Sequence, residues 1–170
     1  WRRLMWREWR RNQRLPDEIY RSPDVTILEI HDKKPAAGSA LGSFLCFDLR
    51  HLLDLLLPQS LQSDWIITLV KFPNPEHTYF EATGLGGEQL EKFAESNSRI
   101  SGPELANFAA KTHQVIWGEF RGYFPKDTAP WVVIRAVDSS FYEVSTEDCS
   151  VLDRLRAAFK DVREGSENFV

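Results

Sequence analysis

Two strand-like segments separated by a short proline-bounded turn place the strongest constraint on how this chain can fold. Residues 114–124 and 131–137 both alternate small or aliphatic side chains with aromatic or charged ones, and residues 125–130 connect them. Such alternation places successive side chains on opposite faces of a strand. A connection this short joins antiparallel neighbours, because parallel strands need a crossover of a dozen or more residues. The pattern therefore predicts a long β-hairpin.

Further segments extend this prediction to a mostly antiparallel sheet of about six to seven strands. Additional strands are expected at residues 25–30, 43–48, 65–71, 78–83 and 140–144, and helices at residues 49–57, 87–96, 101–112 and 146–162. Hairpins outnumber strand–helix–strand units in this order, which favours an α+β fold over a doubly wound α/β fold. We expect the helices to pack on one face of the sheet and the chain to end in an amphipathic helix whose apolar stripe runs from Val151 through Leu155 and Phe159 to Val162.

The opening of the chain differs in composition from the remainder. Residues 1–14 contain six arginines, three tryptophans and one acidic residue, whereas the remaining residues carry 15 basic and 24 acidic side chains. On a helical wheel the segment separates into an apolar stripe of Trp1, Met5 and Trp9 and an opposite stripe of Arg3, Arg7, Arg10 and Arg14. Three roles stay open: a first helix docked through its tryptophans, a contact for a partner protein, or a contact for nucleic acid or an anionic membrane surface. The acidic remainder disfavours the last, because it repels phosphate at long range.

Length and composition limit the class of protein. With 42% hydrophobic and 12% aromatic residues, the 170-residue chain is expected to form a single domain, with an amphipathic helix at 1–15, a core at 16–164 and a tail at 165–170. No apolar run approaches the roughly 20 residues of a membrane-spanning helix, so we expect no membrane span. Cys46 and Cys149 are isolated and match neither a disulfide framework nor a zinc site, which favours a reducing, cytoplasmic compartment.

One face of the predicted sheet is the main candidate binding site. Alternation places aromatic and charged residues together on this face, namely Trp117, Glu119, Arg121, Trp131, Arg135 and Glu143. Aromatic side chains flanked by arginine and glutamate suit protein recognition, because they supply contact area and directional hydrogen bonds together. The same charges also suit cross-strand ion pairs on a solvated face, with the tryptophans packed beneath a helix. Both interpretations stay open at this stage.

A second candidate set surrounds the leucine-rich segment at 49–57. Asp48, His51 and Asp54 recur at intervals of three residues, a spacing that could present three metal ligands on one side of a helix. The alternative is a polar edge of a buried helix with Asp48 as its N-cap. Sequence spacing places no general acid–base pair, so we expect no cofactor and no resident metal and lean against an enzyme.

Together these patterns predict a non-catalytic, acidic protein-interaction domain. An acidic inhibitor of the immunity or antitoxin type is one concrete version, with another protein as partner. The expected contact residues are those of the candidate sheet face together with Arg3, Arg7 and Arg10. One alternative is an enzyme whose site is assembled from Asp48, His51 and Asp54 or from Glu119, Arg121, Arg135 and Glu143. A weaker alternative is nucleic-acid contact through the arginine stripe.

Overall fold

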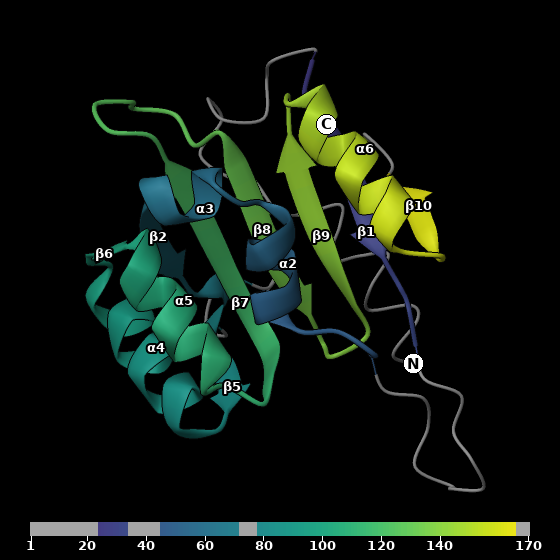
Figure 1. Cartoon of the computed structure of the whole chain (residues 1–170). Coiled ribbons are helices and arrows are strands. Elements are labelled where there is room, and N and C mark those ends of the chain that lie inside the picture. Colours follow the sequence, from purple (N-terminus) through teal and green to yellow (C-terminus); the bar gives the residue numbers. More distant parts are fainter. Residues whose placement is uncertain (1–23, 34–44, 72–77, 166–170) are drawn as a thin grey trace, which may run out of the picture.

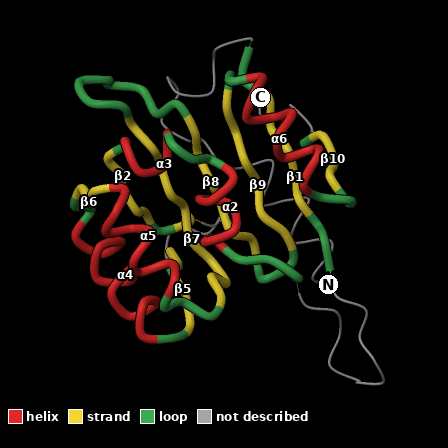
Figure 2. The backbone as a smooth tube through the Cα atoms, in the orientation of Figure 1, coloured by secondary structure: helices red, strands yellow, loops and turns green. Residues whose placement is uncertain are grey.

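A computed structural model describes residues 24–33, 45–71 and 78–165. In this part of the chain the strands form one large antiparallel sheet, and the helices lie together on one of its faces (Figures 1 and 2). The predicted α+β fold is confirmed, with an eight-stranded main sheet in place of the six to seven strands expected. The helix predicted at 1–15 lies outside the described residues. So does the tail predicted at 165–170, apart from its first residue.

The central hairpin sits in the middle of the main sheet. Eight strands make up this sheet: β1 (Thr26–Ile30), β2 (Asp64–Thr68), β5 (Glu81–Thr83), β6 (Arg99–Ser101), β7 (Gln114–Tyr123), β8 (Val132–Val137), β9 (Phe141–Thr146) and β10 (Val162–Glu164). Their order is β10-β1-β9-β8-β7-β2-β6, and β5 pairs with the N-terminal part of β7. The short strands β3 (Val70–Lys71) and β4 (Thr78–Tyr79) form a separate hairpin. The predicted pairing of the two long strands is confirmed as β7 with β8.

Polar side chains at the helix N-termini explain where three of the described helices begin. The five described helices are α2 (Leu49–Leu55), α3 (Gln59–Gln62), α4 (Leu85–Ser96), α5 (Gly102–Ala110) and α6 (Cys149–Ala158). The side chains of Asp48, Ser101 and Asp148 accept hydrogen bonds from backbone N–H groups in the first turns of α2, α5 and α6. The backbone N–H groups of a first helical turn have no acceptor within the helix, so each capping side chain gives one of them a hydrogen-bond partner.

The hydrophobic core lies between the helices and the sheet. It includes Leu52 and Leu53 of α2, Leu105 of α5 and aliphatic residues from the facing side of the strands. Trp65 of β2 is fully buried there. Helices α4 and α5 approach closely at Gly86, where an added Cβ atom would lie only 2.0 Å from a backbone carbonyl oxygen of α5. No helix in the described ranges is long and apolar enough to cross a membrane.

Several predicted elements differ from the structure. The strands predicted at 65–71 and 78–83 are each divided in two, as β2 and β3 and as β4 and β5. The strand predicted at 43–48 is wrong within the described residues: Leu45 makes only an isolated bridge with Lys33, and the chain then turns into α2. The helix predicted at 146–162 is too long, because α6 ends at Ala158 and Val162 belongs to β10. The carboxylate of Asp32 accepts hydrogen bonds from the backbone N–H groups of residues 160 and 161, and β10 then pairs with β1. These long-range contacts outweigh the local helical pattern.

Candidate functional site: the charged face of the sheet

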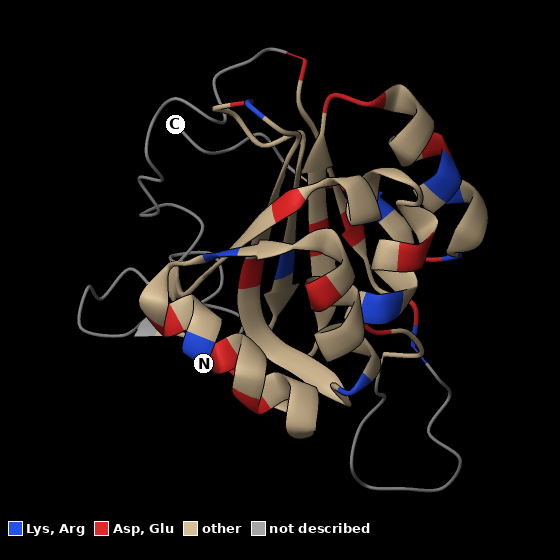
Figure 3. Cartoon of the chain, turned by 60° about the vertical axis from the view of Figure 1, so that its left-hand side comes forward, with Lys and Arg blue, Asp and Glu red and all other residues tan. Residues whose placement is uncertain are grey.

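The sheet register aligns five polar residues in one row on the face opposite the helices, which we call the second face. Antiparallel pairing places directly opposite residues on the same face of a sheet. The pairs Glu29–Glu143, Glu143–Arg135, Arg135–Glu119 and Glu119–Thr68 therefore form a continuous line across β1, β9, β8, β7 and β2. We call these five residues the ionic row. Figure 3 shows acidic and basic residues side by side on neighbouring strands of the sheet.

Arg135 is the central cation of the ionic row. Its Nε and Nη2 donate hydrogen bonds to Oε2 of Glu119 at 2.9 and 2.5 Å, and its Nη1 donates to Oε2 of Glu143 at 3.1 Å. Arg121, two residues beyond Glu119, binds the other oxygen of that carboxylate, with Nε at 2.7 Å and Nη2 at 2.6 Å. Thr68 Oγ1 donates to the same oxygen at 3.2 Å. Glu119 is therefore held from three strands.

Burial and charge act in opposite directions on Glu119. The residue is 3% exposed, and burial by itself raises the pKa of its carboxyl. The positive charges of Arg135 and Arg121, together with their hydrogen bonds, outweigh burial and hold the pKa below its ordinary value. Glu119 is therefore an ionised acceptor fixed in position. This is the opposite of what a general acid requires, because such a group must hold a proton near neutral pH.

Carboxylates and guanidinium groups lie next to one another on the second face. Its buried carboxylates belong to Glu29, Glu119 and Glu143, which are 8%, 3% and 5% exposed. Arg121 and Arg135 bind two of these carboxylates, and Arg163 of β10 lies directly opposite Glu29. His31 Nε2 lies 3.0 Å from Oε2 of Glu29. Glu29 and Glu143 lie directly opposite each other, and this pair of like charges is flanked by Arg163 on one side and Arg135 on the other.

Apolar side chains surround the ionic row and are equally buried. Val133, Val137 and Phe141 are 5%, 0% and 8% exposed, yet none of them belongs to the hydrophobic core beneath the helices. The described helices all pack on the other face of the sheet (Figure 1). Glu29, Trp117, Arg121, Arg135, Phe141 and Glu143 each make at least one interaction in addition to the contacts given above, so none of them is free. Charged and apolar residues of the second face are thus buried together.

The structure brings together most of the predicted binding residues but separates one of them. Glu119, Arg121, Arg135 and Glu143 form the network described above, and Trp117 lies on the same face, opposite Glu81 of β5. Arg3, Arg7 and Arg10 lie outside the described residues.

Trp131 occupies a different environment. Its indole ring stacks on the ring of Phe124, with 5.2 Å between the ring centroids, and its centroid lies 6.5 Å from that of Trp65. Its Nε1–H donates a hydrogen bond to Ser63 Oγ at 2.8 Å. Trp131 precedes the first residue of β8, so the strand alternation that predicted its position does not extend to it.

Sequence reasoning missed Glu29, His31 and Thr68 as members of this site. They come from β1, the segment after it and β2, all distant in sequence from the central hairpin. The sequence contains one weak indication that Glu29 is buried, because it lies between the aliphatic residues of a strand. In the fold Glu29 is only 8% exposed. Which residue lies opposite it depends on strand register, and local sequence does not reveal that register.

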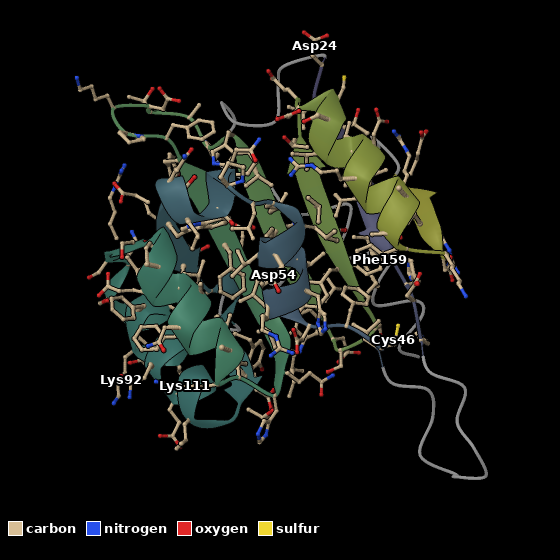
Figure 4. The ribbon with its side chains drawn as sticks, in the orientation of Figure 1. Asp24, Cys46, Asp54, Lys92, Lys111 and Phe159 are labelled. Atoms are coloured by element: carbon tan, nitrogen blue, oxygen red, sulfur yellow. The ribbon has the colours of Figure 1, made fainter. Side chains whose placement is uncertain are left out.

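The residues around α2 have local structural contacts. Asp48 caps the helix through Oδ1, which accepts the His51 N–H at 3.3 Å, and His51 Nδ1 accepts the Asp48 N–H at 3.1 Å. The N-cap interpretation of Asp48 is confirmed. Asp54 is exposed on the outside of α2 (Figure 4). No group of three or more His, Cys, Asp or Glu side chains in the described ranges is arranged to hold a metal ion.

Comparison with protein-family models finds no matching model, and comparisons with curated proteins and with solved structures find no significant match.

Proposed function

We propose that this chain is a non-catalytic protein-interaction domain whose contact surface is the second face of the sheet. The partly exposed aromatic and charged side chains of that face carry the proposal. Trp117 is half-buried and the Arg121 side chain is 16% exposed, and both lie beside the ionic row. Glu119, Arg135 and Glu143 are only 3–5% exposed in the isolated chain, so they hold the strands together. A partner would contact the border of the face rather than these buried charges.

The chemistry of the second face suits specific recognition. Trp117 and Phe141 supply aromatic contact area, and Arg121 lies at its border with a side chain that is 16% exposed. Tryptophan and arginine are enriched among the residues that dominate binding energy at protein interfaces. The fixed carboxylates of the ionic row would penalise a partner that placed its own negative charge there.

Net charge supports a basic partner. The chain contains 25 acidic and 21 basic side chains, a formal charge of −4 with histidine neutral. An excess of this size attracts cationic proteins over distances of about one Debye length, roughly 10 Å at 0.1 M salt. An acidic inhibitor that neutralises a basic enzyme, of the immunity or antitoxin type, is the concrete form of this proposal.

The enzymatic alternative has no observation in its favour. Asp48 and His51 satisfy each other at the start of α2, and Glu119 is bound by two guanidinium groups. These residues of the two candidate active sites therefore already take part in structural contacts.

A matched pair of variants tests the proposed function. The full chain is immobilised and exposed to native lysate beside a face variant, Trp117→Ala/Arg121→Ala, and a control variant, Lys92→Ala/Glu95→Ala, on the exposed outside of α4 (Figure 4). Thermal unfolding first establishes that both variants fold. We expect a basic protein that the unmodified chain and the control retain, that the face variant loses at least tenfold, and that dissociates as NaCl rises from 50 to 300 mM. The proposal fails if no captured protein depends on Trp117 and Arg121.

A further inference from the structure

We propose that a cleft at the β10 edge of the sheet binds a small phosphate monoester that carries further hydroxyl groups. The cleft lies where the segment after β1 meets the connection from α6 to β10 (Figure 1). Its volume is about 540 Å³, within the range of about 300–1,000 Å³ that is usual for small-molecule sites. It is lined by His31, Asp32, Lys33, Lys160, Asp161 and Arg163.

Long-range hydrogen bonds fix the walls of this cleft. The backbone N–H of His31 donates to the carbonyl oxygen of Asp161 at 2.8 Å. The Asp32 carboxylate accepts the backbone N–H groups of Lys160 at 2.9 Å and of Asp161 at 2.6 Å. The His31 ring stacks on Phe141, with 4.7 Å between the ring centroids. The two walls are therefore joined mainly through backbone groups, and a ligand would meet a cleft that is already formed.

Both carboxylates that line the cleft have partners in the fold. Asp32 accepts the two backbone N–H groups named above. Arg163 donates from Nε to one oxygen of Asp161 at 2.8 Å and from Nη2 to the other at 2.9 Å. These hydrogen bonds hold the pKa of Asp161 below its ordinary value, and the positive charge of Lys33 acts in the same direction. Asp161 is therefore an ionised acceptor near neutral pH, and a carboxylate can accept further hydrogen bonds.

The two lysines supply the donors for an anion. Neither Lys33 nor Lys160 makes a hydrogen bond or an ion pair through its ammonium group with another residue of the described ranges. Both line the cleft, one on each of its walls. An ammonium group carries three donors that rotate to suit the ligand. The cleft thus places two charged donors where no protein acceptor occupies them.

The charges around the cleft are balanced rather than strongly positive. Its three cations and two carboxylates give a formal charge of +1 with His31 neutral. Glu29, which contacts His31 and lies opposite Arg163, brings the sum to zero. The whole chain carries −4, so the cleft repels an anion less than the chain as a whole does. Binding therefore depends on short charge-assisted hydrogen bonds from the lysines and not on long-range attraction.

The kind of donor favours phosphate over carboxylate. A planar carboxylate is bound best by the parallel N–H groups of an arginine fork, and Asp161 occupies that fork of Arg163. Lysine acts as a point charge and is a common binder of phosphate. The volume of the cleft leaves room beyond a phosphate group, and Asp32 and Asp161 can accept hydrogen bonds from hydroxyl groups there. A hydroxylated phosphate monoester matches both features.

Titration of the ¹⁵N-labelled full chain with glucose 6-phosphate tests this site, with amide chemical shifts measured at pH 7.5 and constant ionic strength. We expect saturable shift changes in residues 31–33 and 160–163. Inorganic phosphate should bind at least threefold more weakly, and glucuronate, which offers a carboxylate, at least tenfold more weakly.

A matched pair of variants isolates the lysines. Lys33→Ala/Lys160→Ala keeps the backbone N–H groups that bind Asp32 and should weaken glucose 6-phosphate at least tenfold. Lys92→Ala/Lys111→Ala removes the same charge from exposed positions on α4 and after α5 and should stay within twofold of the unmodified chain (Figure 4). Unchanged amide shifts in β7 establish that each variant is folded.

Four results would overturn the inference. The first is the absence of saturable shifts in residues 31–33 and 160–163. The second is glucuronate binding as tight as that of glucose 6-phosphate, and the third is inorganic phosphate binding as tight, which would leave a simple ion site. The fourth is equal weakening in the two lysine variants. Each would leave the proposed function standing, because Trp117 and Arg121 lie on β7, and three strands separate β7 from β10.

Discussion

Replacement of Arg135 by methionine tests whether the ionic row is a buried network that supports the fold. Methionine keeps much of the aliphatic volume of arginine but removes its charge and donors. The change deletes three hydrogen bonds to two carboxylates. Glu119 then keeps Arg121 and Thr68, whereas Glu143 loses its hydrogen bond to Arg135 and still lies opposite Glu29.

The expected loss of stability is large for a domain of this size. Removing one partner of a buried ion pair typically costs about 3–5 kcal/mol, because the remaining charge stays buried without compensation. Total unfolding free energies are about 5–15 kcal/mol, so Arg135→Met should remove a substantial fraction. With an m-value of about 2 kcal/mol per M in urea, the unfolding midpoint should fall by about 2 M.

Urea unfolding at pH 7, followed by far-UV circular dichroism, measures this difference. Arg156→Met is the matched control, because Arg156 is 42% exposed and its 3.3 Å contact with Glu164 lies at the surface. Exposed pairs contribute about 0–1 kcal/mol, so the control should shift the midpoint little. Adding Glu143→Gln to Arg135→Met should recover part of the loss, because it removes the charge of the carboxylate that has lost its hydrogen bond to Arg135. A loss for Arg135→Met no larger than that of Arg156→Met would refute the argument and show that the network is solvated.

Three further predictions concern single groups. The pKa of Glu119 is lowered in the folded chain, so its carboxylate stabilises the fold above its unfolded pKa of about 4.3, and this contribution is lost as pH falls through the lower folded pKa. Glu119→Gln should therefore lower stability at pH 7 and make the decrease of stability below pH ~4 less steep, as measured by urea unfolding midpoints across pH. An unchanged dependence of stability on acid pH would contradict the ion pairing. Gly86→Ala should destabilise the domain by about 1–3 kcal/mol, because the new methyl group would lie 2.0 Å from the carbonyl oxygen of Phe108. If the variant has the same thermal melting temperature as the unmodified chain, helices α4 and α5 can move apart at no energetic cost. Burial and the nearby Asp48 carboxylate raise the pKa of Tyr142, and its buried hydroxyl lies near the backbones of Leu49 and Val115 but makes no hydrogen bond of good geometry among the described residues. Tyr142→Phe should therefore change the unfolding free energy by less than about 1 kcal/mol, and a larger loss would show that the hydroxyl is bound more strongly than this geometry indicates.

Local patterns predicted the elements whose hydrogen bonds are local. The alternation in residues 114–137 was sufficient for the central hairpin, because strand periodicity and a short connection leave few other arrangements. The helix that begins after Ser101 was equally predictable. Its capping box joins Ser101 and Glu104, which are only three residues apart, so it depends on local sequence alone.

Predictions failed where long-range pairing competes with a local preference. Val162 fits the apolar stripe of a helix, but β10 gains a ladder with β1, and the carboxylate of Asp32 holds the chain in the extended turn that leads to it. Trp131 fits the alternation of its neighbours, but its indole finds a hydrogen-bond acceptor in Ser63 and packs on Phe124 instead. In both cases the deciding partner lies far away in the sequence.

The sequence by itself determined the class of fold, the central hairpin, the N-cap at Asp48 and the identity of four charged residues on one sheet face. Tertiary structure alone decided that those residues form a buried network with Glu29 and Thr68, and that Trp131 lies apart from them. Periodicity and capping depend on neighbours within a few residues, so they can be read along the chain. The ionic row depends on the register of five strands, and a slip of one residue would turn each of its side chains to the opposite face.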